Sequence, residues 1–133
     1  MKKYDELPEK KTVEKTMQSL KENGIHALFF EKREEAKKKI LELIPQNAEI
    51  FTMTSVTLDT LNITKEINES SKYNSVRKKL NEMKRETQER EMHRLGASPD
   101  IAIGSVHAVT ENGEVIIASN TGSQLPTYAY GAG

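Results

Sequence analysis

The clearest candidate for binding chemistry is a short polar segment near the end of the chain, residues 120–124 (NTGSQ). Leu125 and Pro126 follow it, and proline is favoured at the first position of a helix, where its missing N–H has no helical partner. The sequence therefore predicts that a helix begins here. The unpaired N–H groups of its first turn, the positive end of its dipole and two hydroxyls would attract a phosphate or a carboxylate. The residues of this predicted anion-binding segment are Asn120, Thr121, Gly122, Ser123 and Gln124.

An ordinary capped helix with nothing bound is the alternative interpretation of this segment. Asn120 or Thr121 would then act as the N-cap. Gly122 favours the binding interpretation, because a residue without a side chain lets a ligand approach the backbone.

A second site of the same kind is predicted at Ser55 and Thr57. Ser55 precedes Val56, Leu58 and Leu61, and serine is a preferred N-cap of a helix. The two hydroxyls would assist anion binding at the start of this short helix, whereas the alternative is that they only cap it.

Composition excludes several classes of function. The 133 residues are enough for one domain with a single core. Lys and Arg (20) balance Asp and Glu (20), so the chain lacks the basic excess of a dedicated nucleic-acid binder. Cysteine is absent, which excludes disulfides, a thiolate nucleophile, iron–sulfur ligation and cysteine-based zinc sites. The three histidines have no metal-ligand spacing, so we expect neither a metal nor a cofactor.

The chain carries no targeting or membrane signal that we recognise. The first residues, MKKYDELPEKK, have no apolar stretch behind their lysines, unlike a signal peptide. No run approaches the ~20 apolar residues of a membrane span. These features predict a soluble cytoplasmic protein.

The first half of the chain alternates predicted helices and strands. Helical spacing of Val13, Met17 and Leu20 ends at Asn23-Gly24, and a second helix is predicted over 32–44. Residues 25–30 (IHALFF) and 48–54 (AEIFTMT) are short apolar runs of the length of buried strands. This order predicts an α/β fold with a mostly parallel sheet.

The second half is more polar. We interpret residues 64–74 as a loop and 75–95 as one charged helix lying outside the sheet. A strand is predicted over 101–103. Asn112-Gly113 between two apolar segments, 105–110 and 115–117, is the strongest short-range signal for a β-hairpin.

Three segments in the last third of the chain resemble the LUD domain, the domain of the lactate-utilisation family. They are residues 99–104 (PDIAIG), 108–113 (AVTENG) and 118–125 (ASNTGSQL). Residues 54–58 (TSVTL) also resemble the serine–threonine helix start of that family, although the glycine that often precedes it is replaced here. The resemblance extends over most of the chain from about Val13.

This resemblance implies an open, Rossmann-like, mostly parallel sheet with a β-hairpin. It also implies relationship to the superfamily of ribose-phosphate isomerases, glucosamine-phosphate deaminases and CoA transferases. Family members continue beyond the Tyr-Gly-Ala step into another strand and helix. We therefore expect residues 1–133 to be a single LUD domain that is truncated at its C-terminus. Either the domain lacks this further strand, or the sequence stops at the end of a gene fragment.

Glu111 is the one candidate for covalent catalysis. The sequence Thr110-Glu111-Asn112-Gly113 resembles the Ser-Glu-Asn-Gly motif of one class of CoA transferases, whose glutamate attacks an acyl-CoA. A carboxylate can act as a nucleophile when it is held and partly desolvated. The alternative is a solvated acidic residue in a hairpin turn.

The sequence therefore leaves two alternative functions open. The first is an accessory subunit that binds a small anionic ligand and docks onto iron–sulfur partner subunits, which would carry the electrons. The second is a stand-alone isomerase or CoA-transferase-like enzyme that uses Glu111. Neighbouring genes for iron–sulfur oxidoreductases would favour the subunit.

Overall fold

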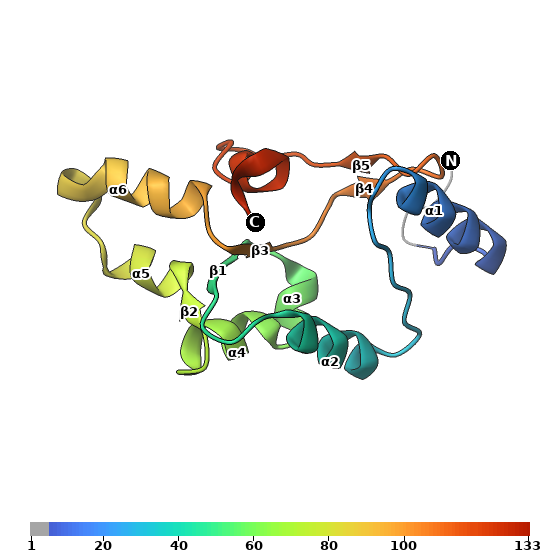
Figure 1. The fold of residues 1–133 in the computed structure, drawn as a ribbon, viewed down its shortest axis with the longest axis horizontal. Helices are drawn as coiled ribbons and strands as arrows, with labels where there is room; N and C mark the ends of the chain where they lie inside the picture. Colours follow the sequence, from blue (N-terminus) through green and yellow to red (C-terminus); the bar gives the residue numbers. More distant parts are fainter. Residues whose placement is uncertain (1–5) are drawn as a thin grey trace. The chain divides into compact units, whose positions relative to one another are not determined.

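The computed structural model describes residues 6–133, which form two compact units (Figure 1). The first unit combines residues 6–29 with Val106–Ala118, and the second combines Phe30–Ser105 with Ser119–Gly133. No helix within residues 6–133 has the length and apolar character needed to cross a bilayer.

A three-stranded parallel sheet organises the second unit, in the order β2-β1-β3. The strands are β1 (Glu49–Thr52), β2 (Asn74–Ser75) and β3 (Ile101–Ile103). Ile50 pairs with Ile101 on one side of β1, and Glu49 pairs with Asn74 on the other. The predictions of an α/β fold, of a parallel sheet and of strands near 48–54 and 101–103 are confirmed.

Helices cover both faces of this sheet (Figure 1). Ile50 faces a core formed with α2 (Arg33–Leu43), α3 (Val56–Thr60) and α4 (Ile63–Glu69). Phe51 points to the opposite face, as adjacent strand residues must, and packs with α5 (Val76–Glu82), α6 (Arg85–Ala97) and the π-helix η1 (Thr127–Gly131). The two apolar cores are therefore separated by the sheet.

Two predictions about the middle of the chain are wrong. Residues 64–74 are not a loop, because α4 begins at Ile63 and β2 at Asn74. Ile63 and Ile67, one helical turn apart, are fully buried and hold α4 against the sheet. Asn62 adopts a left-handed conformation (φ 58°) just before Ile63, which lets the chain turn from α3 directly into α4.

The predicted single helix over 75–95 is divided into α5 and α6. Met83 and Lys84 are extended, and the Lys84 N–H donates to Gln88 Oε1 (3.0 Å). The Gln88 side chain thus satisfies the backbone N–H of Lys84, the residue that precedes α6. A second helix therefore begins at Arg85, where helical periodicity alone predicted that the first helix continues.

The first unit contains α1 (Lys10–Glu22) and an antiparallel hairpin formed by β4 (Ala108–Val109) and β5 (Val115–Ile116). The Asn112-Gly113 turn is confirmed, with Gly113 at φ 79°. The end of α1 at Asn23-Gly24 is confirmed as well: the Asn23 N–H donates to Ser19 O, and Gly24 has φ 81°.

The predicted strand over residues 25–30 is wrong. This segment has no regular secondary structure and belongs to neither sheet, and Ile25, Leu28 and Phe29 are exposed. An apolar run indicates a tendency to be buried, whereas a strand also requires a neighbouring strand to accept its backbone hydrogen bonds.

Candidate functional site

The carboxyl edge of the parallel sheet brings together Ser55 and Ser105, which are 50 residues apart. Ser55 follows β1 and Ser105 follows β3, and their hydroxyls form a short hydrogen bond with each other. The Ser55 hydroxyl also accepts from the Leu58 N–H (3.2 Å), which confirms Ser55 as the N-cap of α3. Ser55 is only 4% exposed, whereas Ser105 is half-buried.

Gly104 and Tyr128 complete this edge. The Tyr128 hydroxyl donates to the Ser105 carbonyl oxygen (3.0 Å), and burial raises its pKa above the ordinary value of tyrosine. A Cβ at position 104 would lie 2.5 Å from the Tyr128 hydroxyl and 3.0 Å from the Met53 sulfur. Glycine is thus required for the close approach of the tyrosine. We call Ser55, Gly104, Ser105 and Tyr128 the switch-point cluster.

The name describes the position of this cluster in the sheet. From β1 the chain crosses through α3 and α4 to β2 on one side, and from β2 it crosses through α5 and α6 to β3 on the other side of β1. The strand order therefore reverses between β1 and β3. In open α/β sheets, the crevice outside the carboxyl ends of the strands at such a reversal is the usual place for a ligand.

The predicted anion-binding segment forms a turn rather than the first turn of a long helix. Helical backbone starts only at Leu125, and the π-helix that follows is short. The Gly122 N–H donates to Ser119 Oγ (3.0 Å), and the Ser123 N–H donates to Thr121 Oγ1 (3.4 Å). Two of the amides predicted to hold an anion thus already have hydroxyl partners, and Gly122 has φ 74°.

Thr57 lies in the first turn of α3, two residues after the N-cap Ser55. It is exposed and lines a hollow of about 310 Å³ together with Phe30 and Arg33. Anion binding by Ser55 and Thr57 together stays a prediction.

Glu111 belongs to the first unit, in the hairpin turn. Its Oε2 lies 2.7 Å from Lys15 Nζ on α1, and the two side chains are 51% and 58% exposed. The predicted nucleophile is therefore held in a solvated ion pair, which leaves its carboxylate less reactive than a desolvated one.

Replacing Glu111 by glutamine is expected to change the free energy of unfolding by about 1 kcal/mol or less, because exposed ion pairs contribute little. We also expect no covalent adduct when the wild-type protein is incubated with an acyl-CoA and then trapped with hydroxylamine or borohydride. Mass spectrometry of the peptide over 108–118 measures this outcome, with Glu114→Gln in the same turn as the matched control. A trapped adduct at Glu111 that is absent from Glu111→Gln would show that the carboxylate is a nucleophile.

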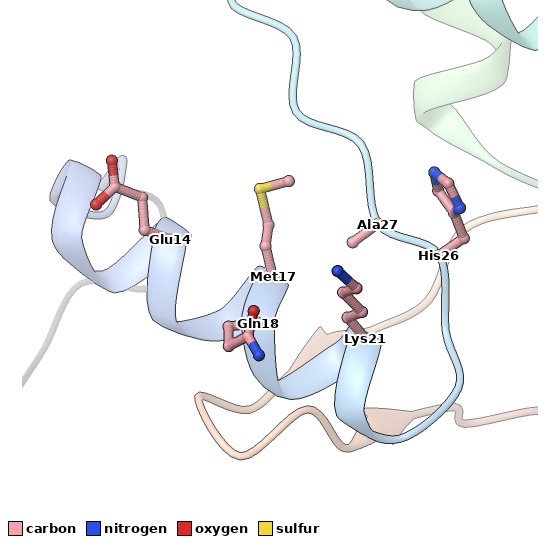
Figure 2. Close-up of a pocket in the computed structure, with 6 residues that line it drawn as sticks. All are labelled: Glu14, Met17, Gln18, Lys21, His26 and Ala27. Atoms are coloured by element: carbon pink, nitrogen blue, oxygen red, sulfur yellow. The ribbon is translucent and has the colours of Figure 1, made fainter.

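A shallow hollow of about 420 Å³ lies beside α1 in the first unit. Figure 2 shows that its polar groups are spread out: Glu14 and Lys21 stand at different places along α1, and His26 stands on the segment that follows the helix. These groups do not converge on one point, so we assign no ligand to this hollow.

The histidines and acidic residues do not build a metal site among residues 6–133, where no three of these side chains come together. The role of His107 is structural, since its Nδ1 accepts from the Ala118 N–H (3.1 Å) and fastens the hairpin.

Sequence analysis did not identify Ser105 or Tyr128 as site residues. Ser105 lies two residues after the strand predicted over 101–103, and its position at the end of that strand was a usable signal. Tyr128 and Tyr130 are two residues apart, and such residues on a helix point to different faces; Tyr128 is half-buried, whereas Tyr130 is 95% exposed.

The parallel sheet with helices on both faces defines the class of the fold, an α/β protein. Comparison with protein families identifies it further: a model of the LUD domain matches residues 13–132. The chain therefore belongs to the LUD domain family, which confirms the resemblance seen in the sequence. Searches of curated proteins and of solved structures gave no match.

Proposed function

We propose that this chain is a non-catalytic LUD-domain subunit of lactate or related organic-acid utilisation, and that it binds a small anion at the switch-point cluster. Family membership supports the link to lactate utilisation. The observation that carries the binding proposal is the meeting of Ser55 and Ser105 at the point where the strand order reverses.

The ligand in this proposal is held by neutral donors. Thr54 is exposed beside Ser55, and Ser105 is half-buried at the end of β3. Their hydroxyls would donate to phosphate or carboxylate oxygens, while Ser55 and Tyr128 hold Ser105 in place. We further propose a Rossmann-like relationship to the isomerase and CoA-transferase superfamily, a cytoplasmic location, and iron–sulfur partner subunits that carry the redox chemistry.

An NMR titration of the full chain with inorganic phosphate and, separately, with lactate tests the binding site. The largest amide shifts are expected at Thr54, Ser55 and Ser105, and Ser105→Ala should weaken binding about fivefold or more by removing a donor to the anion. Ser71→Ala, at an exposed serine in another loop, is the matched control. Largest shifts at Gly122, Ser123 and Gln124 would instead assign the anion to the turn over 120–124, and even shifts over the charged α6 would indicate unspecific surface binding.

Co-purification of the chain from its native host, followed by mass spectrometry of the bound proteins, tests the subunit role. Iron–sulfur proteins recovered in fixed ratio are the expected result. Turnover of lactate or of an acyl-CoA by the purified chain alone would overturn the non-catalytic assignment.

A further inference from the structure

A second cavity, of about 300 Å³, lies on the face of the sheet that α5, α6 and η1 cover. This volume is at the lower end of the range typical of small-molecule sites. Its apolar wall includes Phe51, Leu80, Met92 and Pro126, which come from four different elements or their flanks. The cavity lies within the second unit and does not depend on the binding site proposed above.

Arg77 is the polar group that the fold fixes in this cavity. Its guanidinium carbon lies 4.9 Å from the centre of the Phe51 ring, a distance at which the cation and the ring attract each other. Its Nη2 and Nε also donate to the Thr52 carbonyl oxygen, at 2.8 and 3.3 Å. The guanidinium therefore has one preferred position in the absence of any ligand.

The charge of Arg77 is not neutralised by the protein. Among residues 6–133, no carboxylate forms an ion pair with it; the one carboxylate of the cavity wall, Glu89, pairs with Arg85 (3.7 Å). Arg77 is half-buried, and this desolvation lowers its pKa from the ordinary value of arginine. A partly desolvated cation without a counter-ion is unfavourable, and a bound anion would relieve that cost.

We propose that this cavity binds an organic carboxylate with an apolar body, whose carboxylate pairs with Arg77 and whose body packs against Phe51, Leu80 and Met92. The Nη1 group makes no hydrogen bond within the described part of the chain and remains available to the carboxylate. Ser123 lines the same cavity, and its hydroxyl shares a hydrogen bond with Thr121 Oγ1 (2.8 Å); with Thr121 as the donor of that bond, Ser123 can donate to the second carboxylate oxygen. The apolar wall distinguishes this ligand from inorganic phosphate and from lactate, which offer little apolar surface to bury.

Phenylacetate is the probe for a test by calorimetry and NMR with the full chain. We expect phenylacetate to bind and to shift the amides of Phe51, Arg77 and Ser123. Acetate, which has the charge without the apolar body, and phenylacetamide, which has the body without the charge, should each bind at least about tenfold more weakly. Equal binding of phenylacetate and acetate, or of phenylacetate and phenylacetamide, would overturn the proposal.

Two variants test the residues. Arg77→Met should reduce the affinity for phenylacetate about tenfold or more, whereas Lys78→Met, at the exposed neighbouring cation, should leave it within about twofold. Because Arg77→Met also removes hydrogen bonds to Thr52, its folding is checked by circular dichroism.

Gly96→Leu gives an independent test that leaves Arg77 in place. Gly96 lies in the last turn of α6 and lines the cavity, and a Cβ there meets no atom within 4 Å. A leucine should fill the cavity and abolish phenylacetate binding while the melting temperature is kept or raised, since leucine favours a helix over glycine. Thr87→Leu, an exposed position of α6 outside the cavity, is the control. Undiminished binding by folded Gly96→Leu would show that phenylacetate binds elsewhere.

Discussion

Replacing Gly113 by alanine is expected to destabilise the first unit by about 3 kcal/mol. A Cβ at this position would lie 2.5 Å from the carbonyl carbon of Ser19 and 2.7 Å from the Leu20 nitrogen. These are backbone atoms of α1, which cannot move aside as a side chain can. The left-handed backbone (φ 79°) adds about 1–2 kcal/mol of strain for any residue with a Cβ. Hydrogen exchange of the amides of α1 and the hairpin measures the loss.

Gly24→Ala separates the two contributions to this effect. Gly24 has almost the same backbone angle (φ 81°), but a Cβ there meets no atom within 4 Å. The control should therefore show only the conformational strain. If both variants lose the same stability, the contact between Gly113 and α1 is not as close as the structure has it.

Asn68→Leu is expected to destabilise the second unit by about 2–4 kcal/mol, because it disrupts a buried polar network. Asn68 Oδ1 accepts from the hydroxyls of Ser75 (2.6 Å) and Thr52 (3.1 Å), and its Nδ2 donates to the Thr52 hydroxyl (3.0 Å). These contacts join α4 to β1 and β2. Thr52 and Ser75 are almost completely buried, so their hydroxyls would lose this partner without gaining water. Chemical denaturation measures the change.

Asn81→Leu makes the same substitution at an exposed position of α5 and should change stability by about 0.5 kcal/mol or less. Adding Thr52→Val to Asn68→Leu should recover part of the loss, since removing both partners of a buried hydrogen bond is less unfavourable than removing one. A loss that the second substitution does not reduce would assign the effect of Asn68 to packing.

Much of the local structure could be predicted from the sequence. The hairpin turn required glycine in a left-handed conformation, and Asn112-Gly113 signalled this without any tertiary information. Ser55 was correctly predicted as a helix cap, because the hydroxyl that accepts the Leu58 N–H acts within one turn. The missed helix α4 carried a signal as well, since Ile63 and Ile67 repeat at helical spacing within a polar segment.

The candidate site could be predicted only in part. Ser55 was identified, but the hydroxyl that meets it, on Ser105, comes from a strand paired with β1 across 50 residues. Arg77 is one of three consecutive basic residues, Arg77, Lys78 and Lys79, and the sequence does not show which of them is buried. Only its position beneath the end of β1, against Phe51, leaves it half-buried and without an acidic partner among the described residues.

The sequence by itself determined the elements whose cause is local: the caps, the hairpin turn, the apolar strands near 50 and 102, and the membership in the LUD domain family. Only the tertiary structure decided the order β2-β1-β3, the failure of the apolar segment 25–30 to become a strand, and the cavity around Arg77. The physical reason is that a turn or a cap is satisfied by atoms a few residues away, whereas strand pairing and the desolvation of a charge depend on which distant segments pack together.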